Sequence, residues 1–149
     1  MNTLYTILQA AHSGLRWVVL LLFVLALVNY LLGWQRKRTY QKSDKTLFTL
    51  NLSFFHLQVL LGLVLYFVSP RVQFSELTFS IYLIRFFTVE HALIMLFAAI
   101  LLTVGSVKIK RIAADSKKFR SGFYFLLVSF LLILVAIPWP FYRLGTGWF

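Results

Sequence analysis

The chain has 149 residues, of which 60% are hydrophobic and only 13% are charged, and its formal net charge is +11. Soluble globular domains have about a quarter of their residues charged, so this composition is typical of an integral membrane protein. The absence of cysteine excludes disulfides, iron–sulfur clusters and thiol chemistry.

Four apolar segments cover about residues 7–34, 47–69, 83–107 and 123–137 and leave loops of roughly 12–15 residues between them. A helix rises about 1.5 Å per residue, so about 20 residues cross a hydrocarbon core of about 30 Å. The last segment lies near the lower limit. The sequence therefore predicts one all-α membrane domain over residues 1–149, an up-down bundle of four transmembrane helices.

Basic residues are concentrated in the first and third loops. These loops contain eleven of the fifteen: Arg36, Lys37, Arg38, Lys42, Lys45, Lys108, Lys110, Arg111, Lys117, Lys118 and Arg120. Short loops rich in lysine and arginine stay in the cytoplasm, which predicts that both termini are outside. Such loops also attract anionic membrane lipid, and we favour this explanation of the charge over nucleic-acid binding.

Proline and glycine mark the predicted helix ends. Pro70 is expected to end the second span, and Pro138 and Pro140 the fourth, because proline cannot continue the hydrogen-bond ladder of a helix. Ser121 and Gly122 are expected to open the fourth span.

Six ionisable residues lie inside the predicted spans and are therefore candidate site residues, because ionisable groups are costly in hydrocarbon. They are His12, Arg16, His56, Arg85, Glu90 and His91. A single intramembrane histidine is most simply explained as a residue that forms a hydrogen bond to a neighbouring helix. Because all three histidines of the chain lie in spans, we favour a bound cofactor.

Two histidines on different helices are the usual axial ligands of haem b in membranes. The first and third helices of an up-down bundle are diagonal and leave room for a haem, which favours His12 with His91 as iron ligands. Counted along the helices, His12 and His91 lie about 35 and 26 Å from the basic ends. His56 with His91 has a depth mismatch of the same size and is the alternative, and no ligation is the third outcome.

Arg16 and Glu90 are expected at nearly equal height on the first and third helices. Each needs a partner in a low-dielectric site, and an ion pair between them is the simplest arrangement. Alternatively, Arg16 or Arg85 binds a haem propionate, and Glu90 orients a histidine or carries protons.

Several segments together resemble a family of small four-span proteins of Bacteroidetes bacteria known as "cytochrome B" or cytochrome b-like. They are His12–Trp17, His56–Phe67, Phe86–His91 and Ile137–Phe141. The resemblance covers nearly the whole chain. It implies a multi-pass protein of the bacterial cytoplasmic membrane that binds haem b and transfers electrons.

Three functions remain open from the sequence. The first is a haem-b cytochrome that passes electrons between a quinol and a partner, such as a larger respiratory complex. The second is a cofactor-free accessory subunit of a larger membrane complex. The third, the least favoured, is a histidine-lined transport or metal-handling protein. No nucleophile–base pair, phosphate loop or carboxylate pair predicts an independent enzyme.

Overall fold

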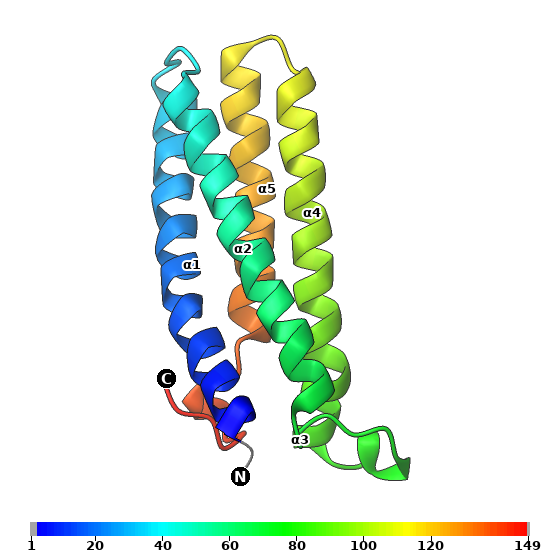
Figure 1. Cartoon of the computed structure of the whole chain (residues 1–149). Coiled ribbons are helices and arrows are strands. Elements are labelled where there is room, and N and C mark those ends of the chain that lie inside the picture. Colours follow the sequence, from blue (N-terminus) through cyan, green and yellow to red (C-terminus); the bar gives the residue numbers. More distant parts are fainter. Residues whose placement is uncertain (1–2, 149) are drawn as a thin grey trace.

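The computed structural model describes residues 3–148, apart from the side chain of Leu77, and shows a bundle of long helices (Figure 1). The α-helices are α1 Thr3–Gln35, α2 Lys42–Val68, α3 Tyr82–Arg85, α4 His91–Arg111 and α5 Asp115–Ala136. A π-helical turn, Phe86–Glu90, joins α3 to α4, so that these residues form one helix from Tyr82 to Arg111. Short 3₁₀ helices cover Glu76–Thr78 and Pro140–Tyr142.

The long helices form an up-down bundle, as the sequence predicts. α1 packs against α2 and α5, and α4 packs against the same two helices, so α1 and α4 lie on one diagonal. Each of the four is long and apolar enough to cross a membrane. The chain is therefore a multi-pass membrane protein with both ends of the chain at one end of the bundle (Figure 1).

The helices reach beyond the predicted spans, and the prediction of loops of 12–15 residues is wrong at the basic end. Only residues 36–41 join α1 to α2, and only residues 112–114 join α4 to α5. α5 begins at Asp115 and not at Ser121. Hydropathy marks the part of a helix that lies in hydrocarbon, whereas its backbone hydrogen bonds continue into the polar interface.

Proline ends the two descending helices as expected. α2 stops at Val68, two residues before Pro70, and α5 stops at Ala136, two residues before Pro138. The residue before each proline, Ser69 or Ile137, has an extended backbone, which is the conformation that a following proline favours.

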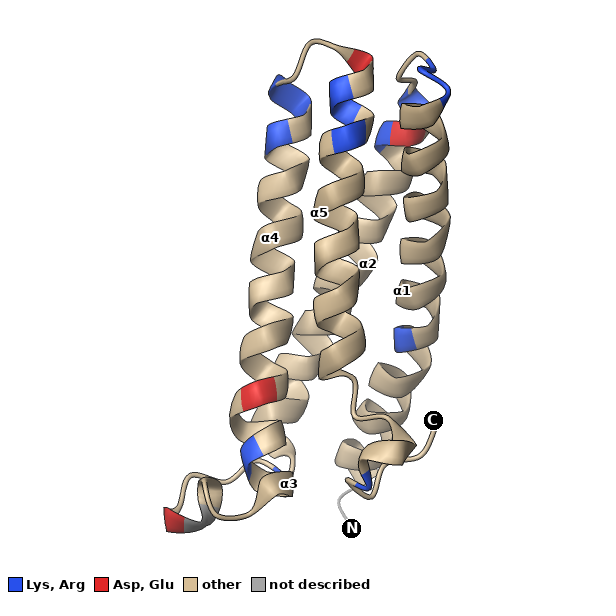
Figure 2. Ribbon diagram, turned by 180° about the vertical axis from the view of Figure 1, so that it is seen from behind, with Lys and Arg blue, Asp and Glu red and all other residues tan. Residues whose placement is uncertain are grey.

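Charge is distributed unevenly along the bundle. Figure 2 shows most lysine and arginine residues at the end that carries the α1–α2 and α4–α5 connections. The middle of the bundle is almost free of charge, as the hydrocarbon core of a membrane requires.

A buried polar network fastens α1 to α2 at the basic end. Asp44 is 2% exposed, and its carboxylate accepts hydrogen bonds from Arg38 at 2.7 and 3.1 Å, from Asn29 at 2.8 Å and from the Gln41 backbone at 2.8 Å. The carboxylate is therefore surrounded by donors, which offsets the cost of its burial. Sequence reasoning treated this loop only as a topology signal and missed the network.

Glycine allows α5 to approach the aromatic core. A Cβ atom at Gly122 would overlap the ring of Tyr30, which is fully buried on α1. We expect Gly122→Ala to lower the free energy of unfolding by about 1–3 kcal/mol, because overpacking forces the neighbouring side chains to shift. Thermal unfolding in detergent measures this loss.

Gly14→Ala is the matched control for this substitution. Nothing lies within 4 Å of a Cβ atom built at Gly14 on α1. Alanine stabilises a helix interior by up to about 1 kcal/mol relative to glycine, so this variant should be as stable as the wild type or slightly more stable. Equal losses for both variants would contradict the close packing of α5 against Tyr30.

Candidate functional site

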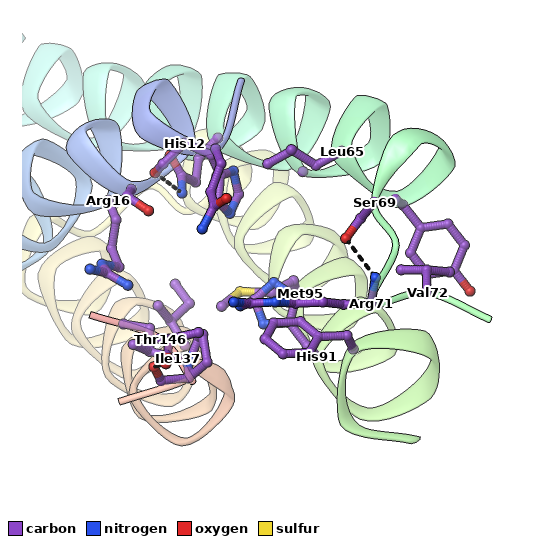
Figure 3. A pocket seen from close by; sticks show the side chains of 18 of the residues that line it. His12, Arg16, Leu65, Ser69, Arg71, Val72, His91, Met95, Ile137 and Thr146 are labelled. Atoms are coloured by element: carbon purple, nitrogen blue, oxygen red, sulfur yellow. Dashed lines mark hydrogen bonds between the residues drawn. The ribbon is translucent and has the colours of Figure 1, made fainter. Parts of the chain in front are cut away.

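A cavity of about 130 Å³ lies between the helices, near the start of α1 and the end of α5, and Figure 3 shows side chains that line it. Its walls come from α1, from α2 and the loop after it, from the π-helical turn and the start of α4, from the end of α5 and from the C-terminal segment. The polar and sulfur-containing side chains in these walls include His12, Arg16, Gln58, Arg71, His91 and Met95. A second hollow of about 60 Å³ shares several of these residues and lies between α2 and α4, where Val59, Leu63 and Leu96 line it.

His12 and His91 face each other in this cavity from the diagonal helices α1 and α4. Their ring centres are 6.4 Å apart and their planes are inclined at 74°. Sequence counting placed them about 9 Å apart in depth. His12 lies 23 residues before the end of α1, and His91 lies 20 residues before the end of α4, because α4 extends to Arg111. The mismatch therefore falls to about 5 Å, which helix tilt and side-chain length cover.

The ring of His91 is oriented by the end of α5. Its Nδ1 lies 2.7 Å from the backbone oxygen of Ala136. A carbonyl only accepts hydrogen bonds, so Nδ1 carries the hydrogen and Nε2 is left as a free lone pair. Ala136 is the last residue of α5, and its carbonyl has no partner within the helix. Glu90 was expected to orient a histidine, but the ring of His91 is oriented by this backbone carbonyl instead.

His12 is held by its backbone and not by its ring. Its carbonyl accepts a hydrogen bond of 2.9 Å from the Gln58 side chain on α2. The ring Nδ1 is buried and has no hydrogen-bond partner among residues 3–148. Gly62 lies against the ring, where an added Cβ atom would be 3.1 Å from Cε1. The close approach of α2 at Gly62 fixes the imidazole of His12, and its Nδ1 has no hydrogen-bond partner within the described residues.

His56 has a different environment from the other two histidines. Its Nε2 lies 3.0 Å from the hydroxyl oxygen of Thr103 on α4, and that hydroxyl donates to the carbonyl of Ala99. The Thr103 hydrogen is therefore in use, and His56 is the donor of the shared bond. His56 is not among the residues that line the cavity. Its position is that of a hydrogen bond between helices.

The structure does not form the expected Arg16–Glu90 ion pair. Glu90 instead accepts a hydrogen bond of 2.7 Å from Arg85. The two residues are five apart and flank the π-helical turn, whose i→i+5 hydrogen bonding brings residues at that spacing to the same face. The guanidinium of Arg16 donates to the backbone oxygen of Trp148. The similar depth of Arg16 and Glu90 in the bundle did not decide the pairing, because Arg85 lies closer to Glu90 on the same helix.

Arg71 is a cavity residue that sequence reasoning did not select. It follows Pro70 in the loop after α2. Its basic charge, at the end of the bundle that has few basic residues, was the one signal in the sequence that could have found it. Its guanidinium donates to the carbonyl of Gly145 at 2.9 Å and lies 5.2 Å from the ring centre of Phe87. Arg85, considered as a propionate ligand, does not line the cavity.

The spacing of the two imidazoles suits one shared iron atom. An imidazole nitrogen binds a metal at about 2.0–2.1 Å and lies about 1.1 Å from its ring centre, so two imidazoles in line on one ion have centres about 6.3 Å apart. His12 and His91 are 6.4 Å apart. No group of three or more histidine, cysteine, aspartate or glutamate side chains within the described residues can hold a bare ion. A haem needs only two axial ligands, and the donors present fit that group.

A haem held by the two histidines would extend into the hollow between α2 and α4, because both His12 and His91 also line that hollow. The small residues Gly62 and Ala92 line that hollow, and Gly62 lies against the ring of His12. Comparison of the chain with protein-family models, with curated proteins and with solved structures finds no match.

Proposed function

We propose that the protein is a b-type membrane cytochrome that holds one haem b between His12 and His91, and the resemblance of its sequence to the cytochrome b-like family supports this proposal. The observation that carries this proposal is the pair of facing imidazoles, 6.4 Å apart, on diagonal helices inside a cavity. Haem b supplies reversible one-electron transfer when it is bound. The site residues are then His12 and His91 as iron ligands.

The protein contributes orientation and a dry environment. The Ala136 carbonyl fixes the tautomer of His91, so that Nε2 is available to the iron. The Gln58 side chain on α2 donates a hydrogen bond to the backbone carbonyl of His12, and this bond fixes the position of His12 along the bundle. Phe55, Ile133 and Ile137 are buried apolar residues that line the cavity, and they limit the access of water to it.

A quinol dissolved in the membrane is the proposed electron donor or acceptor. The hollow between α2 and α4 is lined by Val59, Leu63 and Leu96 and reaches both His12 and His91. These helices cross the hydrocarbon region, so an apolar molecule can approach from the lipid without passing through water. A larger respiratory complex is the proposed partner for the second electron-transfer step.

The visible absorption spectrum of the protein purified from haem-replete cells tests the proposal. A low-spin haem b with two histidine ligands is expected to give split bands on reduction. A colourless protein would contradict the cytochrome function and favour the alternative, a cofactor-free accessory subunit of a larger membrane complex.

We also propose that the protein lies in the bacterial cytoplasmic membrane with its basic end in the cytoplasm. Eleven of the fifteen basic residues lie at that end, and short basic loops are retained there. A reporter that is active only in the periplasm should be active when it is fused to the C-terminus. A reporter that is active only in the cytoplasm should be inactive at the same site, and the opposite pair of results would reverse the orientation.

A further inference from the structure

Within residues 3–148, Arg16 and Arg71 line the cavity without an acidic partner. Arg16 comes from α1 and Arg71 from the loop after α2, and both line the same cavity as His12 and His91 (Figure 3). Both side chains are partly buried. A partly buried guanidinium in a membrane protein requires an anion or several hydrogen-bond acceptors nearby.

The acidic side chains of the chain do not supply that anion. The chain has four: Asp44, Glu76, Glu90 and Asp115. Asp44 pairs with Arg38, Glu90 with Arg85 and Asp115 with Lys118. Glu76 is exposed in the loop before α3 and does not line the cavity.

The present partners of the two arginines are backbone carbonyls of the C-terminal segment. Arg16 donates to Trp148, and Arg71 donates to Gly145. In each case one terminal nitrogen makes the bond, although a guanidinium has five N–H donors. The Nε of Arg16 is buried and has no partner among residues 3–148. Both side chains are therefore held in position and still have N–H groups that can bind a further acceptor.

We propose that Arg16 and Arg71 form a site for the carboxylate groups of the ligand that His12 and His91 bind. This inference rests on the proposed function, since haem b carries two propionate groups on one edge. Guanidinium–carboxylate hydrogen bonds are charge-assisted and are about twice as strong as neutral ones. The two arginines would hold the carboxylate groups of the ligand beside the C-terminal segment, where their guanidinia now donate to backbone carbonyls. Arg85 has no part in the site, because Glu90 occupies it.

Haem and its dimethyl ester separate this site from the histidine site. The apoprotein in detergent is titrated with ferric haem b and with ferric haem b dimethyl ester, which has the same iron and ring but no carboxylate. Binding is followed by the Soret band. We expect the wild type to bind the ester at least about tenfold more weakly, because the ester cannot form the charge-assisted hydrogen bonds to the two guanidinium groups.

Substitutions assign the effect to the two arginines. Arg71→Ala and Arg16→Ala should each weaken haem binding about tenfold and leave ester binding unchanged, and the unchanged ester affinity shows that the variant is folded. Arg71→Lys should recover part of the loss, because lysine keeps the charge but not the planar fork. Arg85→Ala is the matched control and should bind both compounds as the wild type does.

The outcomes separate the two proposals. Equal affinity of the wild type for haem and ester would overturn the carboxylate site and leave the histidine site standing. Equal weakening of both compounds by Arg71→Ala would also overturn it, since the arginine would then act through the fold alone. If neither compound binds, the proposed function fails first, and the carboxylate site fails with it.

Discussion

Replacing His12 or His91 with alanine is expected to abolish the split visible bands of the reduced protein. A low-spin haem iron requires both axial ligands, and the two imidazoles face each other at 6.4 Å in one cavity. The measurement is the reduced-minus-oxidised spectrum of each purified variant. Imidazole added to His91→Gly should restore the bands in part, because it can fill the vacated space and supply the missing nitrogen.

His56→Ala is the matched control, since it removes the third intramembrane histidine. It deletes the hydrogen bond to Thr103 and should lower the free energy of unfolding by about 0.5–1.5 kcal/mol while the bands remain. If His56→Ala removes the bands and His12→Ala does not, the ligands are His56 and His91. If all three variants keep them, histidine ligation itself is wrong.

Replacing Asp44 with alanine is expected to cause the largest loss of stability among the charged residues, about 3 kcal/mol. Removing one partner of a buried ion pair typically costs about 3–5 kcal/mol, and the lower value applies because the Arg38 side chain is 35% exposed. Asn29 loses an acceptor in the same variant. The measurement is thermal unfolding in detergent.

Asp115→Ala provides the comparison for this prediction. Asp115 also lies in the first turn of a helix at the basic end, but its pair with Lys118 is partly exposed and 3.2 Å long. Pairs of this kind contribute little to stability, and the backbone of Tyr40 is the other hydrogen-bond donor to Asp115, so the melting temperature should fall much less than in Asp44→Ala. Similar melting temperatures for the two variants would show that the buried network does not hold α1 to α2.

The polar partners could not be predicted from the height of residues along each helix. Glu90 was expected to meet Arg16 but pairs with Arg85 across a π-helical turn, and hydropathy does not reveal that turn. The ring partner of His91 is the Ala136 carbonyl, a backbone atom with no signature in the sequence. Arg71 enters the site because the loop after α2 folds back against the C-terminal segment.

The sequence by itself determined the class of the protein, because hydrophobic length and the position of charges are properties of single segments. Four apolar stretches required four spans, and short connections required that neighbours run antiparallel, which placed α1 and α4 on a diagonal. Only the tertiary structure decided which polar groups meet. Those contacts depend on helix tilt, on the length of each helix beyond its apolar part and on a local change of helical repeat. Each moves a side chain by several ångströms, whereas a hydrogen bond tolerates only a few tenths of one.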